Sequence, residues 1–289
     1  MDEVRRPVAR PGCVLVRVTA SGICNTDLEL ARGYHGFSGI PGHEFVGTIE
    51  GPEGSPRKGQ RVVGEINLAC GRCEWCRRDL GRHCPRRTVL GIRRHPGAHA
   101  EYLTLPDNNI HIVPPEISDE EAVFVEPLAA ACEILDQVEI TEKTRAAVLG
   151  PGKLGRLAAQ VLAHAGADVT LLGRRRRARA HSFDLVVEAT GSPAGMPRAL
   201  ELVRPRGTIV WKTTHHQPAR FDAAPLVVNE VTVVGSRCGR FEPALALLAA
   251  RKIEVKSLIS AEFPLARAVS ALREAGRPGV RKVILRPRL

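Results

Sequence analysis

The chain has 289 residues, of which 44% are hydrophobic and 25% are charged. This composition is typical of a folded globular protein and excludes a disordered, collagen-like or coiled-coil chain. The length suits two domains. No window approaches the ~20 apolar residues that a membrane helix needs, and the first residues lack the apolar stretch of a signal peptide. The sequence therefore predicts a cytoplasmic protein without a membrane span.

The basic residues outnumber the acidic ones, 42 to 31, which gives a formal net charge of +11. Such a charge can indicate binding to nucleic acid. Only seven of the 42 are lysines, however, and the chain is rich in Ala, Gly and Pro, so codon bias in a GC-rich genome explains the charge equally well. Because aromatic residues make up only 4%, too few for a base-stacking platform, we expect no nucleic-acid partner.

Short β-like runs broken by Gly, Pro and Asn extend from residue 14 to about 115, as in an irregular, barrel-like β domain. A helix is predicted over residues 118–138, with Ser118 as N-cap and Glu121 completing a capping box. The pattern then changes to strand, helix, strand, which is a βαβ unit and implies a parallel sheet with a right-handed crossover. The predicted α/β elements are strands 146–150, 168–173, 184–191, 207–213 and 231–236 and helices 154–166 and 195–203. A last helix (263–276) and strand (280–287) could complete either domain.

Four of the eight cysteines fall within fifteen residues: Cys70, Cys73, Cys76 and Cys84. Four soft ligands this close can surround one tetrahedral ion, and a closed four-thiolate zinc site would stabilise a loop without doing chemistry. The C-x2-C-x2-C spacing followed by Cys84-Pro85 is also similar to an iron–sulfur ligand run. The seven-residue gap and the absence of a second cluster favour zinc.

A second, more dispersed set of metal-ligating residues is Cys24, His43 and Glu126. A catalytic zinc uses about three protein ligands of mixed sulfur, nitrogen and oxygen type and keeps one position open. Each residue also has an ordinary interpretation, because a lone His is commonly structural and Glu126 could lie on a helix surface.

The third motif, Gly150-Pro151-Gly152-Lys153-Leu154-Gly155, lies between a predicted strand and helix. Glycines there allow a tight turn and close approach of a pyrophosphate to the helix N-terminus. Where an NAD-binding fold commonly has a carboxylate for the ribose, this chain has Gly173, followed by Arg174, Arg175 and two more arginines. These arginines favour the 2′-phosphate of NADP; the alternative is a solvated basic turn.

Together and in this order, these motifs resemble the zinc-containing medium-chain dehydrogenase/reductase superfamily of alcohol and polyol dehydrogenases. The similarity includes GICNTD at 22–27, PGHEFVGTIE at 41–50, EPLA at 126–129 and DLVVEATG at 184–191. It implies a GroES-like catalytic domain (1–127), a Rossmann NAD(P)-binding domain (128–255) and a C-terminal segment (256–289) that returns to the catalytic domain.

The resemblance also implies roles for individual residues. Cys24, His43 and Glu126 would hold a catalytic zinc, and Glu44 would be a carboxylate that can exchange onto it. Asp27 would orient the His43 imidazole, and Thr26 would take the alcohol proton. In this mechanism zinc lowers the pKa of the bound alcohol, and hydride passes to the nicotinamide.

The implied protein is a dehydrogenase of a secondary alcohol or polyol with two zinc ions per chain, a homodimer or homotetramer. Substrate-lining residues would come from loops near Tyr34, Phe37 and His215-His216.

Two features depart from the family pattern. Glu29 stands where polyol relatives carry a proton-relay histidine, and only about ten residues separate the second nucleotide-domain strand from 184–191, so an edge strand should be missing. The shortened domain leaves an alternative open, a non-catalytic relic that acts as a zinc-stabilised binding or regulatory protein.

Overall fold

The protein is described by a computed structural model that covers residues 3–33, 36–214 and 218–287. Its contacts divide it into two compact units, one of Met1–Glu126 with Ala244–Leu289 and one of Pro127–Pro243. The sequence predicts divisions after residues 127 and 255. The contact boundary at 243 falls inside helix α8 (Phe241–Ala249), so the chain rejoins the first unit within that helix.

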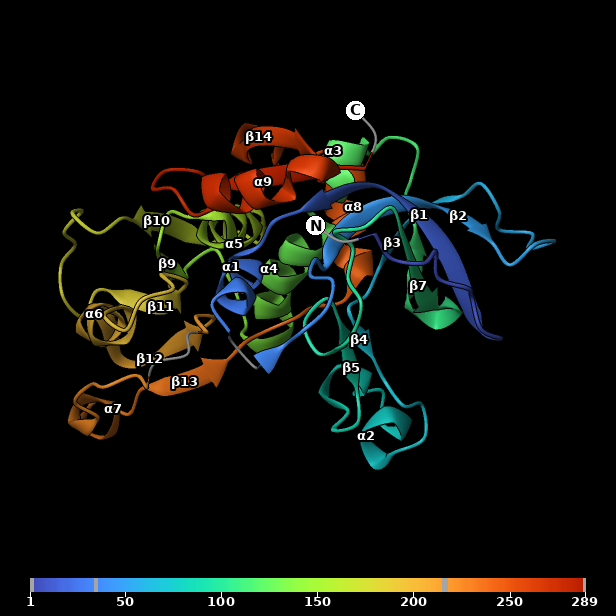
Figure 1. Ribbon diagram of the computed structural model, residues 1–289. Helices are drawn as coiled ribbons and strands as arrows, with labels where there is room; N and C mark the ends of the chain where they lie inside the picture. Colours follow the sequence, from blue (N-terminus) through green and yellow to red (C-terminus); the bar gives the residue numbers. More distant parts are fainter. Residues whose placement is uncertain (1–2, 34–35, 215–217, 288–289) are drawn as a thin grey trace. The chain divides into compact units, whose positions relative to one another are not determined.

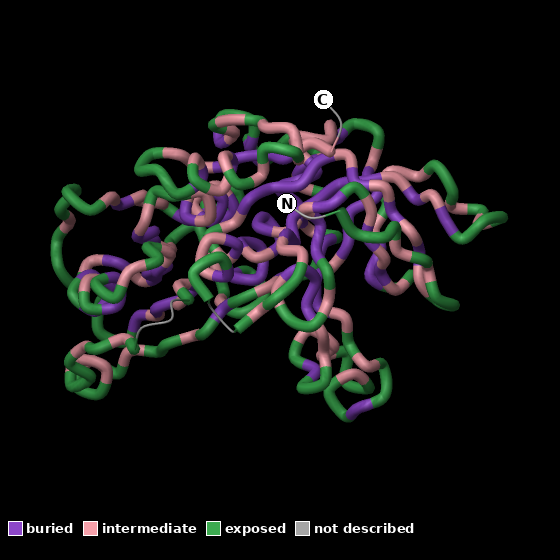
Figure 2. Tube along the Cα trace, viewed as in Figure 1, coloured by how far each residue is buried: buried purple, intermediate pink, exposed green. Residues whose placement is uncertain are grey.

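The first unit contains a seven-stranded sheet of order β14-β15-β1-β2-β3-β8, in which β7 also pairs with β1 (Figure 1). Alternate residues of the long central strand β1 are buried, which is the period expected for a strand with one core face. Figure 2 shows this strand as a mostly buried path. The strands are β1 (Cys13–Gly22), β2 (Glu44–Gly51), β3 (Arg61–Gly64), β7 (Tyr102–Pro106), β8 (Ile110–Ile112), β14 (Ile259–Pro264) and β15 (Lys282–Arg286).

A small three-stranded sheet and several short helices complete this unit. The sheet joins β4 (Asn67–Leu68), β5 (Thr88–Leu90) and β6 (Arg94–His95). The α-helices are α1 (Asn25–Ala31), α2 (Glu74–Arg77), α3 (Asp119–Ala122) and α9 (Ala268–Ala275), and the 3₁₀ turns are η2 (Gly81–His83), η3 (Asp107–Asn109), η4 (Lys256–Leu258) and η5 (Leu265–Arg267). Because β15 pairs antiparallel with the end of β1, the C-terminal tail belongs to this unit.

The helix predicted over 118–138 is two helices, α3 and α4 (Val125–Gln137). Its N-terminus is as predicted, because the Glu121 amide donates to Ser118 Oγ and the Ser118 amide donates to Glu121 Oε2. The break has a local cause in Pro127. A proline lacks the amide donor and its ring clashes with the carbonyl four residues earlier, here that of Val123.

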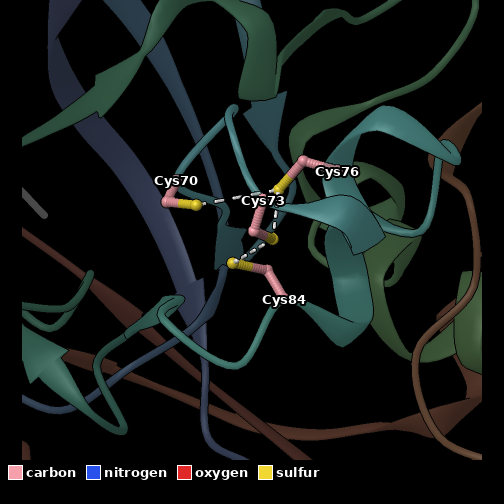
Figure 3. A group of neighbouring side chains, drawn as sticks. All are labelled: Cys70, Cys73, Cys76 and Cys84. Atoms are coloured by element: carbon pink, nitrogen blue, oxygen red, sulfur yellow. Dashed lines mark hydrogen bonds between the residues drawn. The ribbon is translucent and has the colours of Figure 1, made fainter.

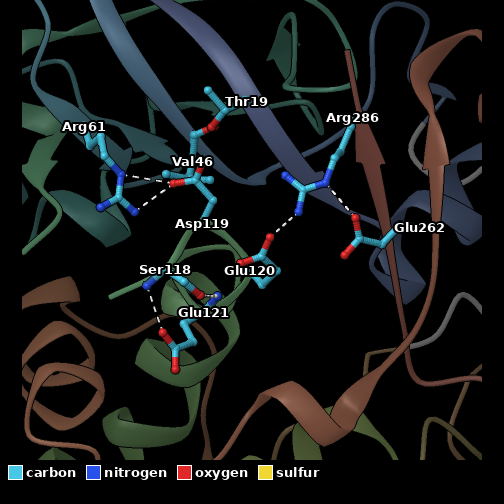
Figure 4. Close-up of polar contacts among 9 residues, drawn as sticks. All are labelled: Thr19, Val46, Arg61, Ser118, Asp119, Glu120, Glu121, Glu262 and Arg286. Carbon is cyan, nitrogen blue, oxygen red and sulfur yellow. Dashed lines mark hydrogen bonds and ion pairs between the residues drawn. The ribbon is translucent and has the colours of Figure 1, made fainter. Parts of the chain in front are cut away.

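Two acidic residues of α3 form hydrogen-bonded ion pairs with arginines of the sheet (Figure 4). The Arg61 guanidinium donates to Asp119 Oδ1 at 2.7 and 3.0 Å. Arg286 of β15 donates to Glu120, and its Nε lies 2.6 Å from Glu262 Oε2 on β14. The hydrogen bond to Glu262, followed by the one to Glu120, raises the pKa of Arg286. These contacts link α3, β14 and β15.

The second unit contains a five-stranded parallel sheet of order β10-β9-β11-β12-β13. The chain runs outward from β9 to β10 and then continues on the other side of β9, which is the switch point of a doubly wound fold. Its elements are β9 (Arg145–Leu149), α5 (Lys153–His164), β10 (Asp168–Leu172), β11 (Phe183–Glu188), α6 (Gly195–Leu202), β12 (Val203–Trp211), α7 (Ala224–Val228) and β13 (Thr232–Gly235). Among the described residues β10 is the sheet edge, as expected from the short link that follows it.

The core of this unit lies between the sheet and its helices. Buried strand residues such as Leu149, Val186 and Ile209 pack with Met196 and Leu200 of α6. No helix among the described residues combines the length and hydropathy needed to cross a bilayer.

Candidate functional sites

The four clustered cysteines converge in the loops beside β4 and β5, with their sulfurs directed toward one another (Figure 3). Cys73 caps the single turn of α2, which carries Cys76, and η2 delivers Cys84. The sulfur–sulfur distances are 3.4 Å for Cys73–Cys76, 3.7 Å for Cys73–Cys84 and 4.0 Å for Cys70–Cys76. Four sulfurs at about 2.3 Å from one tetrahedral zinc lie about 3.8 Å apart, so the cage fits that ion.

The pKa values of the thiols in this cage are shifted in opposite directions. The Arg72 backbone amide, the largest influence, lowers the pKa of Cys70 to about 6, whereas burial raises the pKa of Cys76 to about 11. Four crowded sulfurs without a cation cannot all be thiolates, because like charges repel. A divalent cation at the centre would stabilise every thiolate.

The second site forms where the start of α1 meets the start of β2. Asp27 of α1 is buried, and it accepts hydrogen bonds from the Cys24 amide at 2.7 Å and the Gly42 amide at 3.2 Å. This one carboxylate therefore fixes the backbone beside both Cys24 and His43. Gly42 has φ of +100°, and a side chain there would collide with His99, so only glycine fits the turn.

Two buried imidazoles flank Asp27. His43 Nδ1 lies 3.4 Å from Oδ1, and His99 Nε2 lies 3.6 Å from Oδ2, while His99 Nδ1 is 3.0 Å from Ser21 Oγ. Burial would raise the pKa of Asp27, but the charge of His43 and the contacts to both imidazoles hold it well below its usual range. Burial opposes a charge on His43, yet Asp27 raises its pKa well above the ordinary value. The ionised Asp27 thus faces Nδ1 of His43 and leaves Nε2 for a metal, as in other metal-binding histidines.

Glu44 is completely buried and only half paired. Its Oε2 accepts from Lys282 Nζ, which is fully buried and lies 5.3 Å from the centre of the Phe124 ring. The other oxygen, Oε1, has no hydrogen-bond partner among the described residues. An unpaired buried carboxylate oxygen is costly, and a cation would satisfy it.

One ligand atom each from Cys24, His43 and Glu44 lie within 4.8 Å of one another. Sulfur, imidazole nitrogen and carboxylate oxygen form a donor set that suits zinc, so these residues fit the implied metal. Glu126, in the first turn of α4, lies outside this group. Thr26 Oγ1 is 3.8 Å from Cys24 Sγ.

The structure describes only some of the other residues named from the sequence. Glu29 is ion-paired with Arg32 at 2.7 Å. Phe37 is half-buried, whereas Tyr34, His215 and His216 lie outside the described residues.

The glycine-rich loop of the second unit joins β9 to α5 as predicted. Gly150 has φ of +98°, and a Cβ on it would meet the Ala189 carbonyl at 2.5 Å. A Cβ on Gly155 would lie 1.9 Å from the Gly150 carbonyl oxygen, so this position permits only glycine. Gly152 is the N-cap of α5 and has open space around it. Lys153 and Leu154 follow as the first residues of that helix, and the N-terminus of a helix can bind a phosphate.

Gly173 follows β10 directly. A Cβ atom added to Gly173 would lie 3.5 Å from the ring of Pro151. The end of β10 therefore lies against the glycine-rich loop. Arg174 and Arg175 are exposed, and neither guanidinium has a hydrogen bond or ion pair among the described residues.

Comparison with known proteins agrees with both halves of this structure. Residues 10–115 match the model of the alcohol dehydrogenase GroES-like domain, and residues 175–250 match the zinc-binding dehydrogenase model. Alcohol dehydrogenase TADH from Thermus sp. ATN1 is 31% identical, with a TM-score of 0.86 over 99% of this chain and 95% of its own. The chain belongs to the zinc-dependent medium-chain dehydrogenase/reductase superfamily. The GroES-like and Rossmann architecture implied by the motifs is thereby confirmed.

Two further relatives extend over nearly the whole chain. Sorbitol dehydrogenase from Halalkalibacterium halodurans is 27% identical over 325 positions, which cover 98% of this chain and 94% of the relative. A zinc-binding dehydrogenase from Sinorhizobium meliloti 1021, solved bound to NADP, is 26% identical with a TM-score of 0.86, covering 98% of this chain and 94% of that one. The 325 aligned positions exceed the 289 residues here, so the relative has segments that this dehydrogenase lacks.

Sequence reasoning missed two residues of the Cys24–His43–Glu44 site, Lys282 and His99, whose side chains are buried. Lys282 lies beside Arg281 in a predicted strand that also carries Arg286, so the local pattern does not single it out. Nothing in the local pattern around His99 indicates that it faces Asp27.

Proposed function

We propose that this dehydrogenase oxidises a secondary alcohol or polyol to the ketone or aldehyde, using NAD(P) and a zinc held by Cys24, His43 and a carboxylate. The observation that carries the proposal is the Cys24–His43–Glu44 cluster, in which His43 and Glu44 are buried and one carboxylate oxygen has no hydrogen-bond partner among the described residues. A sorbitol dehydrogenase among the relatives supports a polyol as substrate. The carboxylate ligand is Glu44 or Glu126, and the second zinc of the chain occupies the four-cysteine cage.

The side chains around this cluster have separate tasks. Zinc bound there supplies Lewis acidity that polarises an alcohol oxygen. Thr26, beside Cys24, accepts a hydrogen bond from the substrate hydroxyl and, as it takes that proton, passes its own proton on to water. Asp27 keeps the proton of His43 on Nδ1, and Lys282 balances the charge of Glu44. The hydride acceptor is the nicotinamide.

The second unit binds the cofactor through Gly150, Gly152, Gly155 and the start of α5, and we propose that NADP is preferred. Gly173 stands where a ribose-binding carboxylate is usual, and the free guanidiniums of Arg174 and Arg175 suit a 2′-phosphate. A relative solved with NADP supports NAD(P) as the cofactor class.

Changing Arg174→Ala together with Arg175→Ala is expected to raise the Kd for NADPH by about 10- to 100-fold, because charge-assisted hydrogen bonds to the phosphate are lost. The Kd for NADH should change by less than about twofold, since NADH lacks that phosphate. Titration of the cofactor fluorescence measures both constants. An equal loss for the two cofactors would make these arginines ordinary surface charges.

A homodimer or homotetramer is the proposed assembly, in a cytoplasmic location. The strand β13 is a sheet edge with exposed Val233, and Val227 and Val228 of the neighbouring α7 are each 79% exposed. Exposed sheet edges and apolar side chains are covered in stable proteins, here by a second copy.

None of the eight cysteines forms a disulfide, as expected in a reducing compartment.

The direct test is NAD(P)H formation, followed at 340 nm, with a panel of polyols and secondary alcohols. Turnover that saturates with both cofactor and alcohol is the expected result. A relic would bind neither NADH nor NADPH saturably, and that outcome would overturn the proposal.

A further inference from the structure

The crossover segment, residues 173–182, joins the end of β10 to the start of β11 and must cross β9, because β9 lies between those two strands (Figure 1). Parallel strands are usually joined by a dozen or more residues that include a helix. This segment contains no helix. Its backbone polar groups therefore need partners from elsewhere.

Helix α6 supplies partners at the far end of the segment. The His181 amide donates to the Glu201 carbonyl at 3.0 Å, and the Ser182 amide donates to the Leu202 carbonyl at 3.1 Å. Ala178, in the middle of the segment, packs on the core cluster that contains residues of α6. The segment is thus laid along α6 rather than along a strand of its own.

At the near end, beside the glycine-rich loop, the partner is one side chain of the same helix. The half-buried Arg198 guanidinium donates to the carbonyl oxygens of Gly173 at 2.9 Å, of Arg174 at 3.3 Å, and of Arg176. A guanidinium has five N–H donors in a rigid plane, so it can hold several carbonyls in fixed positions at once.

This arrangement is unusual in its charge. The Arg198 guanidinium binds the backbone of a segment that itself carries four consecutive arginines, residues 174–177. All four are exposed. Three carbonyl dipoles directed at Arg198 stabilise its charge against that repulsion. With the carbonyls held toward Arg198, the guanidiniums of Arg174 and Arg175 remain unpaired at the end of β10.

We propose that Arg198 is a positioning residue that sets cofactor specificity, by holding the turn at 173–176 in the conformation in which Arg174 and Arg175 meet the 2′-phosphate of NADP. The role rests on the proposed preference for NADP. It requires no contact between Arg198 and the cofactor.

Titrating NADPH and NADH against the intact protein tests this role. Arg198→Ala is expected to raise the Kd for NADPH about tenfold and to change that for NADH less than twofold. Arg198→Lys should behave like Arg198→Ala, because a lysine keeps the charge but cannot bond three carbonyls in one plane. Arg145→Ala is the matched control, since it removes an exposed guanidinium from the opposite end of the same sheet. It should leave both constants unchanged.

The outcomes separate the inference from the function on which it rests. If Arg198→Ala weakens both cofactors equally, Arg198 only supports the fold of the unit and the inference fails. If Arg198→Lys binds NADPH as tightly as the unaltered protein, its charge and not its geometry matters, and the positioning role is wrong. If the Arg174 and Arg175 double variant loses both cofactors equally, the preference for NADP itself fails.

Discussion

Cys24→Ser and His43→Ala are each expected to reduce kcat for alcohol oxidation by at least about 10³-fold. The reason is that several kcal/mol of charge stabilisation at the alcohol oxygen depend on the metal that these residues hold. Each variant should also lose one zinc per chain. Both effects follow from the position of the two ligands, which share the buried carboxylate Asp27 as their backbone anchor.

Loss of folding would mimic loss of catalysis, so each variant needs a control. Cys13→Ser changes a partly buried thiol of β1, which belongs to neither metal cluster, and it should retain full turnover and both zinc ions. Thermal unfolding should show that all three variants are folded, and the four-cysteine cage should keep its zinc in each of them. Full activity in Cys24→Ser or in His43→Ala would refute the assignment of the catalytic metal.

The second large effect concerns stability. Lys282→Met is expected to lower the free energy of unfolding by about 3–5 kcal/mol, because it leaves the buried charge of Glu44 without its counter-charge. Both side chains are almost inaccessible to water, at 0% and 1% exposure, so solvent cannot compensate. Equilibrium unfolding in urea, with the metal-free protein, measures the change.

Two variants isolate the cause of that effect. Lys256→Met removes a side chain that is 56% exposed and should change stability by less than about 0.5 kcal/mol. Adding Glu44→Gln to Lys282→Met removes the orphaned charge, and it should recover most of the lost stability. A Lys282→Met protein as stable as the unaltered chain would show that Glu44 is not a buried anion.

Local signals predicted much of the fold. The capping box of Ser118 and Glu121 forms as expected, because it involves residues three positions apart. The glycine-rich turn was also predictable, since the collisions around Gly150 and Gly155 are a fixed property of a tight strand-to-helix connection. The predicted helix is interrupted at Val123 and Phe124, where the effect of Pro127 outweighs the apolar pattern.

Contacts between residues far apart in the sequence could not be predicted from the sequence. Lys282 and Glu44 are 238 positions apart, and nothing local indicates that β15 brings one to the other. His99 reaches Asp27 only because the turn at Gly42 leaves room for its ring. The role of Arg198 likewise depends on the crossover segment, residues 173–182, which contains no helix. The sequence shows this segment only as a short interval between two predicted strands. Strand β14 and helices α7 and α8 were not predicted either, because they are short or lack a clear apolar period.

We propose that one chain holds two metal ions in two different donor sets. Metal content per chain, measured by plasma mass spectrometry on protein purified without added metal or chelator, tests it most directly. About two zinc ions per chain are expected, one for each donor set. One zinc per chain, with no second uptake when zinc is added, would contradict the catalytic site and leave only the four-cysteine cage filled.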